Sequence, residues 1–447
     1  MKNKIGFVSL GCCKNLVDAE RIITQLTCNG YQITHNYQTA NLVIINTCGF
    51  INPSIDESFD AIREALDAGC RIIITGCLGA RKSFLQENFP EEQIVGITGP
   101  HSYDEVYRLV QQALPIPGDR HLCHQDVPNP GIKLTPDHYA YLKISEGCSN
   151  KCTFCAIPYL RGPMISRPVD SIMAETDALL ERGVKELMVV AQDTADYGRD
   201  INFQKAVYQG KEYTSDFLTL VDFLSRKDVW VRLHYLYPYP SLKKIIPYLK
   251  DSAIVPYLDI PLQHSSPEIL KKMHRPGNIT RVAEDILSWK EQVPDLCIRT
   301  SFIVGFPGET DADFENLLDF IRKVRLDRVG CFCYSNVHGV KANDYPDQIP
   351  ENIKNERYNA FMKVQQEISA EIMKSKIGQE MPVIVDNVDR EEKVIIARSR
   401  FDSPDIDGNV FIPYEKDDIV PDPGSIIKAE IYDAGEYDLY GKFLHRK

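Results

Sequence analysis

The stretch that most constrains the fold holds three cysteines, Cys148, Cys152 and Cys155, directly after the apolar run 139–144. Three thiolates within eight residues reach one centre only if the loop wraps around it, and such sites favour zinc or an iron–sulfur cluster. A structural zinc takes four protein ligands, yet no fourth Cys or His follows at ligand spacing. A cubane cluster with one unligated iron can use that iron to bind a substrate, so the count favours iron and sulfur. The alternative of three core cysteines is disfavoured, because chance seldom places three so close together.

Three further cysteines share one position relative to apolar strands. Cys12, Cys48 and Cys77 each lie two residues beyond such a run, in Leu-Gly-Cys, Asn-Thr-Cys and Thr-Gly-Cys contexts. Parallel strands bring their carboxyl ends to one edge of the sheet, where open α/β sheets bind ligands. Each cysteine alone is better explained as a small hydrophobic residue at a strand end. Three in the same register predict a second metal centre.

The pattern of apolar runs divides the first part of the chain into two segments. Residues 1–113 alternate strands at 4–10, 41–46 and 71–75 with helical patterns at 15–28 and 53–68, which predicts a parallel α/β sheet. We expect Asn52 to cap the second helix, with Pro53 in its first turn. Residues 114–136 contain five prolines and two glycines and are predicted to form a linker.

Two more domains are predicted after the linker. Residues 137–375 carry six strands at roughly forty-residue spacing, which predicts a partly open β/α barrel with its active site at the carboxyl ends of the strands. The expected strands are 139–145, 186–191, 229–236, 256–260, 297–304 and 328–334, and residues 202–213 look like an insertion. Residues 376–447 alternate short strands with turn signals, which is typical of a small antiparallel β-barrel.

Composition limits the number of domains, the location and the classes of partner that we expect. At 447 residues, two to three domains are expected. The sequence has no run of eighteen apolar residues and no signal-peptide core at its start, so we expect a cytoplasmic protein without a membrane segment. Thirteen cysteines without a signal argue for reduced thiols and metal ligation. The net charge of −12 favours a basic protein or a small molecule as partner over nucleic acid.

The cysteine loop, together with Ile-Pro-Tyr-Leu-Arg-Gly at 157–162 and Ser-Arg at 166–167, resembles the radical S-adenosylmethionine (SAM) enzymes, and within them the methylthiotransferases. The resemblance implies that Cys148, Cys152 and Cys155 hold a 4Fe-4S cluster whose open iron chelates the amino and carboxylate groups of SAM. It also implies that Phe154 packs near the adenine.

Polar residues and glycines follow the barrel strands in a way that packing does not explain. Gln192 and Asp193 end the second strand, at the place where the family binds the methionine part of SAM. The stretch 303–309 resembles the segment that contacts adenine. From these positions we expect the cofactor to be bound by Gln192, Asp193, Arg232, Ile303, Gly305 and Pro307, in addition to Phe154. A glycine-rich turn alone is weak evidence, since a simple loop role fits it equally well. His234 and His264 are expected to be core or rim residues.

The opening stretch 9–20 resembles the signature of the methylthiotransferases that modify a ribosomal protein. Relatives that modify tRNA usually have Gln-Met-Asn where this chain has Cys13, Lys14 and Asn15. The resemblance implies that Cys12, Cys48 and Cys77 hold an auxiliary 4Fe-4S cluster that supplies the methylthio group. Residues 398–408 resemble the TRAM domain that ends these enzymes.

The resemblance predicts a transferase that methylthiolates the β-carbon of an aspartate in the twelfth protein of the small ribosomal subunit. It implies a low-potential electron donor, such as flavodoxin or ferredoxin, and a basic ribosomal protein as partner, with tRNA not expected to bind. Two alternatives stay open from the residues: methylthiolation of a modified adenosine in tRNA, and a non-catalytic iron–sulfur scaffold or electron carrier.

Overall fold

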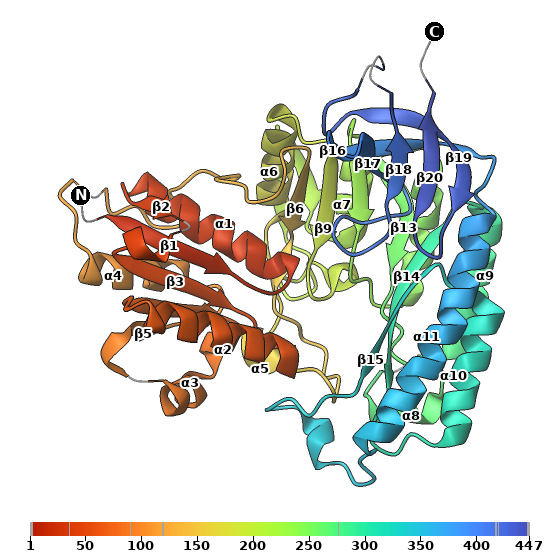
Figure 1. Cartoon of the computed structure of the whole chain (residues 1–447), viewed down its shortest axis with the longest axis horizontal. Coiled ribbons are helices and arrows are strands. Elements are labelled where there is room, and N and C mark those ends of the chain that lie inside the picture. Colours follow the sequence, from red (N-terminus) through yellow and green to blue (C-terminus); the bar gives the residue numbers. More distant parts are fainter. Residues whose placement is uncertain are drawn as a thin grey trace.

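The computed structural model describes residues 3–444 apart from residues 35, 90, 119, 276, 416, 417 and 419. The chain forms an N-terminal α/β unit, a central β/α unit and a C-terminal barrel (Figure 1). This is the predicted fold class, and the order of the three units along the chain is the predicted order. None of the described helices is both long enough and apolar enough to span a lipid bilayer.

The N-terminal unit is a five-stranded parallel sheet in the order β2-β1-β3-β4-β5. Its strands are β1 (Lys4–Ser9), β2 (Gln32–Thr34), β3 (Leu42–Thr47), β4 (Ile72–Gly76) and β5 (Ile94–Ile97). Helices α1 (Cys13–Cys28) and α4 (Tyr103–Ala113) pack on one face, and α2 (Asn52–Asp67) and α3 (Lys82–Asn88) pack on the other. The prediction that Asn52 caps α2 is wrong, because α2 already begins at Asn52 and Ile51 occupies the cap position without a side-chain hydrogen bond.

The segment between α4 and the central unit contains no described helix or strand, and it runs along α1. The side-chain amide of Asn29 donates to the carbonyl oxygen of Leu122 over 3.0 Å, and the Arg21 guanidinium donates to the carbonyl oxygen of His124 over 3.0 Å. These contacts fasten the connection to the N-terminal unit along its course.

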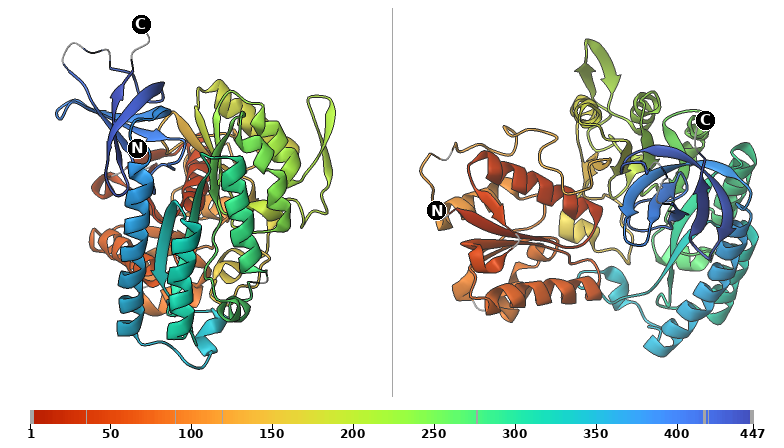
Figure 2. Two further views of the ribbon diagram at one scale, coloured as in Figure 1. Left: turned by 90° about the vertical axis from the view of Figure 1, so that its right-hand side faces the viewer. Right: turned by 45° about the horizontal axis from the view of Figure 1, so that its top comes forward.

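The central unit is a row of six parallel strands, in the order β15-β14-β13-β12-β9-β6, whose outer strands do not pair with each other. The strands are β6 (Tyr139–Lys143), β9 (Glu186–Val190), β12 (Trp230–Leu233), β13 (Ile254–Asp259), β14 (Cys297–Val304) and β15 (Arg328–Cys333), so all six predicted strands are confirmed. Helices α6 (Val169–Glu181), α7 (Phe217–Ser225), α9 (Ile279–Gln292), α10 (Asp311–Val324) and α11 (Glu351–Lys374) surround the sheet. The insertion forms the hairpin β10 (Lys205–Tyr208) and β11 (Lys211–Thr214), which projects from the body (Figure 2).

The C-terminal unit is a closed barrel in the order β16-β17-β18-β20-β19. Its strands are β16 (Glu380–Asp389), β17 (Val394–Ser399), β18 (Val410–Pro413), β19 (Ile426–Ala434) and β20 (Leu439–Phe443). Four of the five strand pairs are antiparallel as predicted, whereas β18 and β20 run parallel. Alternate residues, such as Val383, Val385, Ile395 and Ile412, fill the barrel interior, which is the period-two pattern that a closed sheet requires.

The loop between β17 and β18 packs against the face of the central sheet that lies opposite its helices. There Val255, Tyr257 and Cys297 form a buried cluster that Phe401 contacts. The Tyr257 hydroxyl donates to Asp407 over 2.7 Å, and Arg328 forms a buried ion pair with Asp402. The C-terminal barrel thus closes one end of the central unit with buried polar contacts.

Arg232 belongs to this junction, and its contacts there disfavour the predicted role in cofactor binding, which stays a prediction. Its side chain is fully buried, and all three guanidinium nitrogens are engaged. Nε and Nη2 donate to Glu186 over 3.0 and 2.8 Å, and Nη1 donates to the carbonyl oxygen of Arg400 over 2.9 Å. These contacts and the full burial of its side chain make Arg232 a residue of the interface with the C-terminal barrel.

Candidate active site

The loop of Cys148, Cys152 and Cys155 is shaped by short-range contacts. It leaves the two-residue strand β7 (Ser145–Glu146) and continues into the five-residue helix α5 (Ile157–Arg161). The amide of Cys148 donates to the carbonyl oxygen of Gly162 over 3.1 Å, which brings the two ends of the loop together. Gly147 has φ +69°, and a Cβ there would lie 2.2 Å from the carbonyl oxygen of Pro163, so the turn requires glycine. The three thiols are therefore held on one tight loop.

Gln192 and Asp193 lie beside this loop, as predicted, at the carboxyl end of β9. Asp193 accepts hydrogen bonds from the side-chain amide of Asn150 (2.7 Å) and the Tyr239 hydroxyl (2.9 Å). Gln192 donates to Glu146 over 3.3 Å. In the part of the chain that the structure describes, Gln192 Oε1 and Asp193 Oδ1 are buried without a hydrogen-bond partner. Two orphaned acceptors beside a thiol loop fit a ligand that carries hydrogen-bond donors and positive charge.

Burial raises the pKa of Asp193 to about 6, although hydrogen bonds from Tyr239 and Asn150 oppose the shift. A bound cation would favour the carboxylate and lower this pKa again. We therefore expect the Asp193 carboxylate to favour a positively charged ligand.

The other predicted cofactor residues lie in the same unit. Phe154 and Ile303 are partly buried against its core, and Pro307 is buried. The turn after β14 is closed by Glu309, which accepts from the amide of Phe306 over 3.0 Å and also from the amide of Gly305. Gly305 has φ +71°, and a Cβ there would lie 2.3 Å from Cγ of Lys354, so helix α11 supports the turn from behind. Contact of these residues with adenine stays a prediction.

The second cysteine triad gathers at one edge of the N-terminal sheet. Cys12 precedes α1, Cys48 follows β3 and Cys77 follows β4. Asn15 ties the three strand ends together, since its amide donates to the carbonyl oxygens of Leu10 and Thr47 over 2.9 Å each. Its oxygen also accepts from the Cys77 thiol over 3.5 Å. The strand register thus brings together cysteines that are up to 65 residues apart in the sequence.

Both cysteine triads are wider than the ligand set of a single metal ion. Thiolates around one tetrahedral zinc lie about 3.8 Å apart, given Zn–S bonds of ~2.3 Å. Among the described residues, only Asp18, His101 and Glu146 bring three possible ligand atoms within 4.8 Å of one another. Neither cysteine triad is that tight, whereas a four-iron cluster holds its thiolates farther apart. Three cysteines in each triad leave one iron of such a cluster open.

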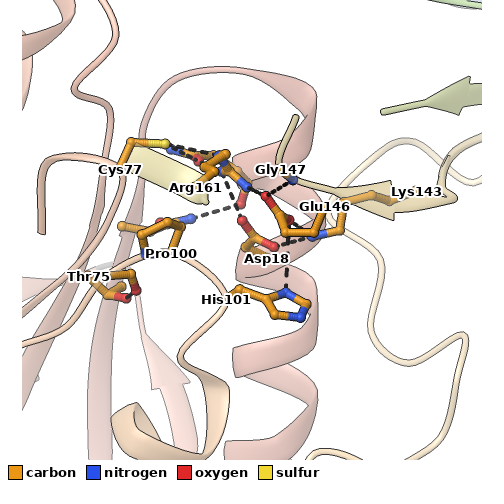
Figure 3. A network of polar contacts seen from close by, with 12 residues as sticks. Asp18, Thr75, Cys77, Pro100, His101, Lys143, Glu146, Gly147 and Arg161 are labelled. Carbon is orange, nitrogen blue, oxygen red and sulfur yellow. Dashed lines mark hydrogen bonds and ion pairs between the residues drawn. The ribbon is translucent and has the colours of Figure 1, made fainter. Parts of the chain in front are cut away.

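The carboxylates of Asp18 and Glu146 already have cationic partners from the chain itself (Figure 3). Lys143 Nζ pairs with Asp18 and, over 2.9 Å, with Glu146. Arg161 pairs with the same two carboxylates over 3.0 and 2.6 Å. All four side chains are at most 7% exposed. Two internal cations balance two internal anions, so this group is a buried ion-pair network and not a vacant cation site.

Arg161 also links this network to the second cysteine triad. Its Nε donates to Sγ of Cys77 over 3.2 Å (Figure 3). Burial raises the pKa of Cys77 to about 12, and the positive charge of Arg161 opposes that rise. Our sequence reasoning did not assign a role to Arg161 or Glu146. The only signal was their position, because Arg161 lies within the stretch 157–162 and Glu146 directly precedes the cysteine loop.

The comparisons with known proteins agree with this geometry. The radical SAM superfamily matches residues 142–321, the uncharacterized protein family UPF0004 matches residues 4–96, and the TRAM domain matches residues 377–444. A solved radical S-adenosylmethionine methyltransferase, TsrM from Kitasatospora setae, superposes with a TM-score of 0.51 at 13% identity, over 74% of this chain and 75% of that one. That likeness concerns the fold alone. Together these matches define a radical SAM enzyme with a TRAM domain, a class that uses SAM and a 4Fe-4S cluster.

Full-length relatives narrow the class further. The ribosomal protein uS12 methylthiotransferase RimO of Proteus mirabilis (strain HI4320) is 50% identical over 443 residues, covering 99% of this chain and 98% of the relative. The protein of the same name from Cronobacter sakazakii (strain ATCC BAA-894) is 50% identical over 441 residues with the same coverage. The chain belongs to the RimO family of radical SAM methylthiotransferases. The resemblance found in the sequence is confirmed, and neither the scaffold nor the tRNA alternative is favoured.

Proposed function

We propose that this enzyme adds a methylthio group to the β-carbon of an aspartate in ribosomal protein uS12. The observation that carries the proposal is the match of 99% of the chain, at 50% identity, to relatives named ribosomal protein uS12 methylthiotransferase. The alternative, methylthiolation of a tRNA adenosine, has no comparable support. Because the substrate belongs to the ribosome, we also propose that the enzyme acts in the cytoplasm.

Each half of the reaction is assigned to one cysteine triad. Cys148, Cys152 and Cys155 hold the cluster that binds SAM, and when bound these groups supply the radical chemistry that an unactivated C–H bond requires. Gln192 and Asp193 orient the methionine part through their two free oxygens. Phe154, Ile303, Gly305 and Pro307 form the adenine side of the same pocket. The protein contributes position and exclusion of water.

Cys12, Cys48 and Cys77 are proposed to hold a second 4Fe-4S cluster, which carries the methylthio group. The support is chemical, because three thiols without a fourth protein ligand leave an iron open for a sulfur ligand. Arg161 places a fixed positive charge at Cys77, which stabilises a thiolate there. A low-potential donor such as flavodoxin or ferredoxin is proposed to reduce the enzyme.

The charge of the C-terminal barrel supports a basic partner. Residues 376–447 contain sixteen Asp and Glu against ten Lys and Arg, a net of −6. Part of this charge holds the barrel in place, since Asp386 pairs with His138 over 2.7 Å and Asp402 pairs with Arg328. The remainder is acidic, and an acidic surface attracts a basic ribosomal protein and repels RNA phosphates.

The test is mass spectrometry of uS12 and of total tRNA from cells with and without this gene. We expect the mass of a methylthio group on one aspartate of uS12 to disappear with the gene and to return with a plasmid copy. Loss of a tRNA modification with uS12 unchanged would overturn the proposal.

A further inference from the structure

A cleft of about 620 Å³ lies between the N-terminal and central units, outside the pocket assigned to SAM. We call it the α2–α5 cleft, and its lining includes Asp56, Phe59, Phe84, Glu87, Tyr159 and His338. Helices α2, α3 and α5 lie on the same side of the molecule in Figure 1. The cleft is larger than the opening of about 270 Å³ that Cys12 and Cys13 line.

The walls of the cleft come from segments that directly follow cysteines of both triads. Helix α2 begins four residues after Cys48, and α5 begins two residues after Cys155. Arg81, which leads into α3, is 5% exposed and donates to the carbonyl oxygens of Gly49 and His338 over 3.2 and 3.4 Å. It therefore fastens the wall beside the auxiliary triad to the wall beside the SAM-side triad. A chain segment bound in the cleft would contact both cysteine-bearing units.

The lining offers aromatic faces and carboxylates. Phe84 is 38% exposed and Tyr159 is 50% exposed, although large apolar side chains are usually covered. The side chain of Phe84 stacks on Phe59, with ring centroids 5.5 Å apart, and Tyr159 packs edge-on against His338 at 5.8 Å. These ring contacts hold the aromatic side chains in place, which lowers the entropy lost when a ligand binds.

The charges around the cleft have one dominant sign. Helix α2 carries five Asp and Glu against one Arg, and that residue, Arg63, already pairs with Asp60 over 2.9 Å. Among the lining residues that the structure describes, Arg81 is the only Lys or Arg, and its guanidinium is directed at backbone carbonyl groups. Carboxylates beside exposed aromatic rings suit Lys and Arg side chains, through ion pairs and cation–π contacts. The same carboxylates disfavour a phosphate backbone.

We propose that the α2–α5 cleft binds the Lys- and Arg-containing segment of the substrate protein that flanks the target aspartate. This inference rests on the proposed function, and it deepens that function by assigning the docking surface to the junction of the two cysteine-bearing units. The C-terminal barrel then attracts the ribosomal protein at long range, and the cleft fixes the segment that is modified.

The test uses the full chain with reconstituted clusters and purified uS12 as the probe. The double variant Asp56→Lys/Glu87→Lys reverses both carboxylates of the lining. The matched control, Glu315→Lys/Asp319→Lys, makes the same charge change on exposed positions of α10, on the other side of the molecule. Steady-state kinetics of methylthiolation at two salt concentrations give KM and kcat. Iron content and the circular dichroism spectrum check folding, and Phe84→Ser tests the aromatic face without a change of charge.

We expect the cleft variant to raise KM for uS12 at least about tenfold with kcat within about twofold, and to weaken the salt dependence of KM. The control should keep the wild-type KM, and Phe84→Ser should raise KM about fivefold. Wild-type KM values in both cleft variants, with uS12 still modified, would overturn the docking surface alone. If the wild-type enzyme modifies tRNA and not uS12, the proposed function fails and the docking proposal fails with it. If Asp56→Lys/Glu87→Lys loses its iron, Phe84→Ser alone decides the matter.

Discussion

Replacing Arg161 by Met tests the buried network that joins the two cysteine-bearing units. Arg161 donates to Glu146, Asp18 and Cys77 from a side chain that is 1% exposed. Met has a similar length but no charge, so the variant leaves two buried carboxylates with Lys143 as their only cation. Because Asp18 belongs to α1 and Glu146 to the central unit, the loss falls on the contact between the units.

The expected loss of stability follows from the burial of the carboxylates that Arg161 contacts. Removing one member of a buried ion pair costs about 3–5 kcal/mol, because the other charge stays buried without compensation. Two hydrogen bonds to carboxylates are lost here, and Lys143 compensates one of them in part, so we expect about 3 kcal/mol. At an m-value of about 3 kcal/mol/M, the urea midpoint should fall by about 1 M.

The pH dependence of the free energy of unfolding provides an independent check of the same contacts. Burial raises the pKa of Glu146, but the charges of Lys143 and Arg161 outweigh burial and hold the pKa well below its usual 4.5. A pKa that is lower in the folded than in the unfolded protein gives stability that is present above about pH 4.5 and is lost as the pH falls. In Arg161→Met this acid-induced loss should become shallower.

The assay is urea unfolding of the full chain, followed by circular dichroism. Arg199→Met serves as the control, because Arg199 is 69% exposed and its contact with Asp196 is 3.5 Å long, so its loss should cost less than about 1 kcal/mol. Adding Glu146→Gln to Arg161→Met should restore part of the stability. An Arg161→Met midpoint equal to that of the control, or no recovery with Glu146→Gln, would refute the reasoning.

Three further outcomes are expected. Anaerobic reconstitution should load about eight irons per chain, and about half of the iron should remain after either triad is changed to Ala, as an iron assay will show. SAM cleavage, measured as 5′-deoxyadenosine, should be lost only in the variant of Cys148, Cys152 and Cys155. The affinity for SAM, measured by calorimetry, should rise between pH 5 and 7 as Asp193 loses its proton, because its pKa is about 6, and Asp193→Asn should flatten that rise. Arg232→Ala should lower the free energy of unfolding by about 3 kcal/mol, because Glu186 keeps Arg398 as a cationic partner, while the Kd for SAM stays unchanged; a weakened Kd would support a role of Arg232 at the cofactor site.

Sequence patterns predicted the elements that carry strong apolar runs. All six strands of the central sheet lie in such runs. One triad was marked by the loop that follows the first of these strands, and the other by single cysteines after three strands of the N-terminal sheet. Strands β2 and β5 were missed because they are edge strands of only three and four residues, with side chains that are exposed or half-buried. Asn52 before Pro53 looked like a helix cap, but the cap position depends on backbone angles at Ile51 that composition does not reveal.

Long-range contacts explain the remaining differences. Arg232 lies in a barrel strand, where polar residues commonly face a ligand, yet its partner carbonyl belongs to Arg400, 168 residues later in the chain. Arg161 and Cys77 are 84 residues apart and meet only when two units dock. Neither partner could be inferred from local spacing, because the geometry is set by how separately folded units pack together.

The length of helix α5 limits how far the distance between the two cysteine triads can change. It consists of five residues that follow the cysteine loop and end at Arg161, a length of about 7.5 Å at 1.5 Å per residue. One inserted residue would turn Arg161 by about 100° around the helix axis and carry its guanidinium away from Cys77. Point substitutions on the outer side of this helix leave the spacing intact, whereas any change of its length alters it. The length of α5 therefore sets the distance from the cysteine loop to the Arg161 contact with Cys77. A redesign of the enzyme should leave that length unchanged.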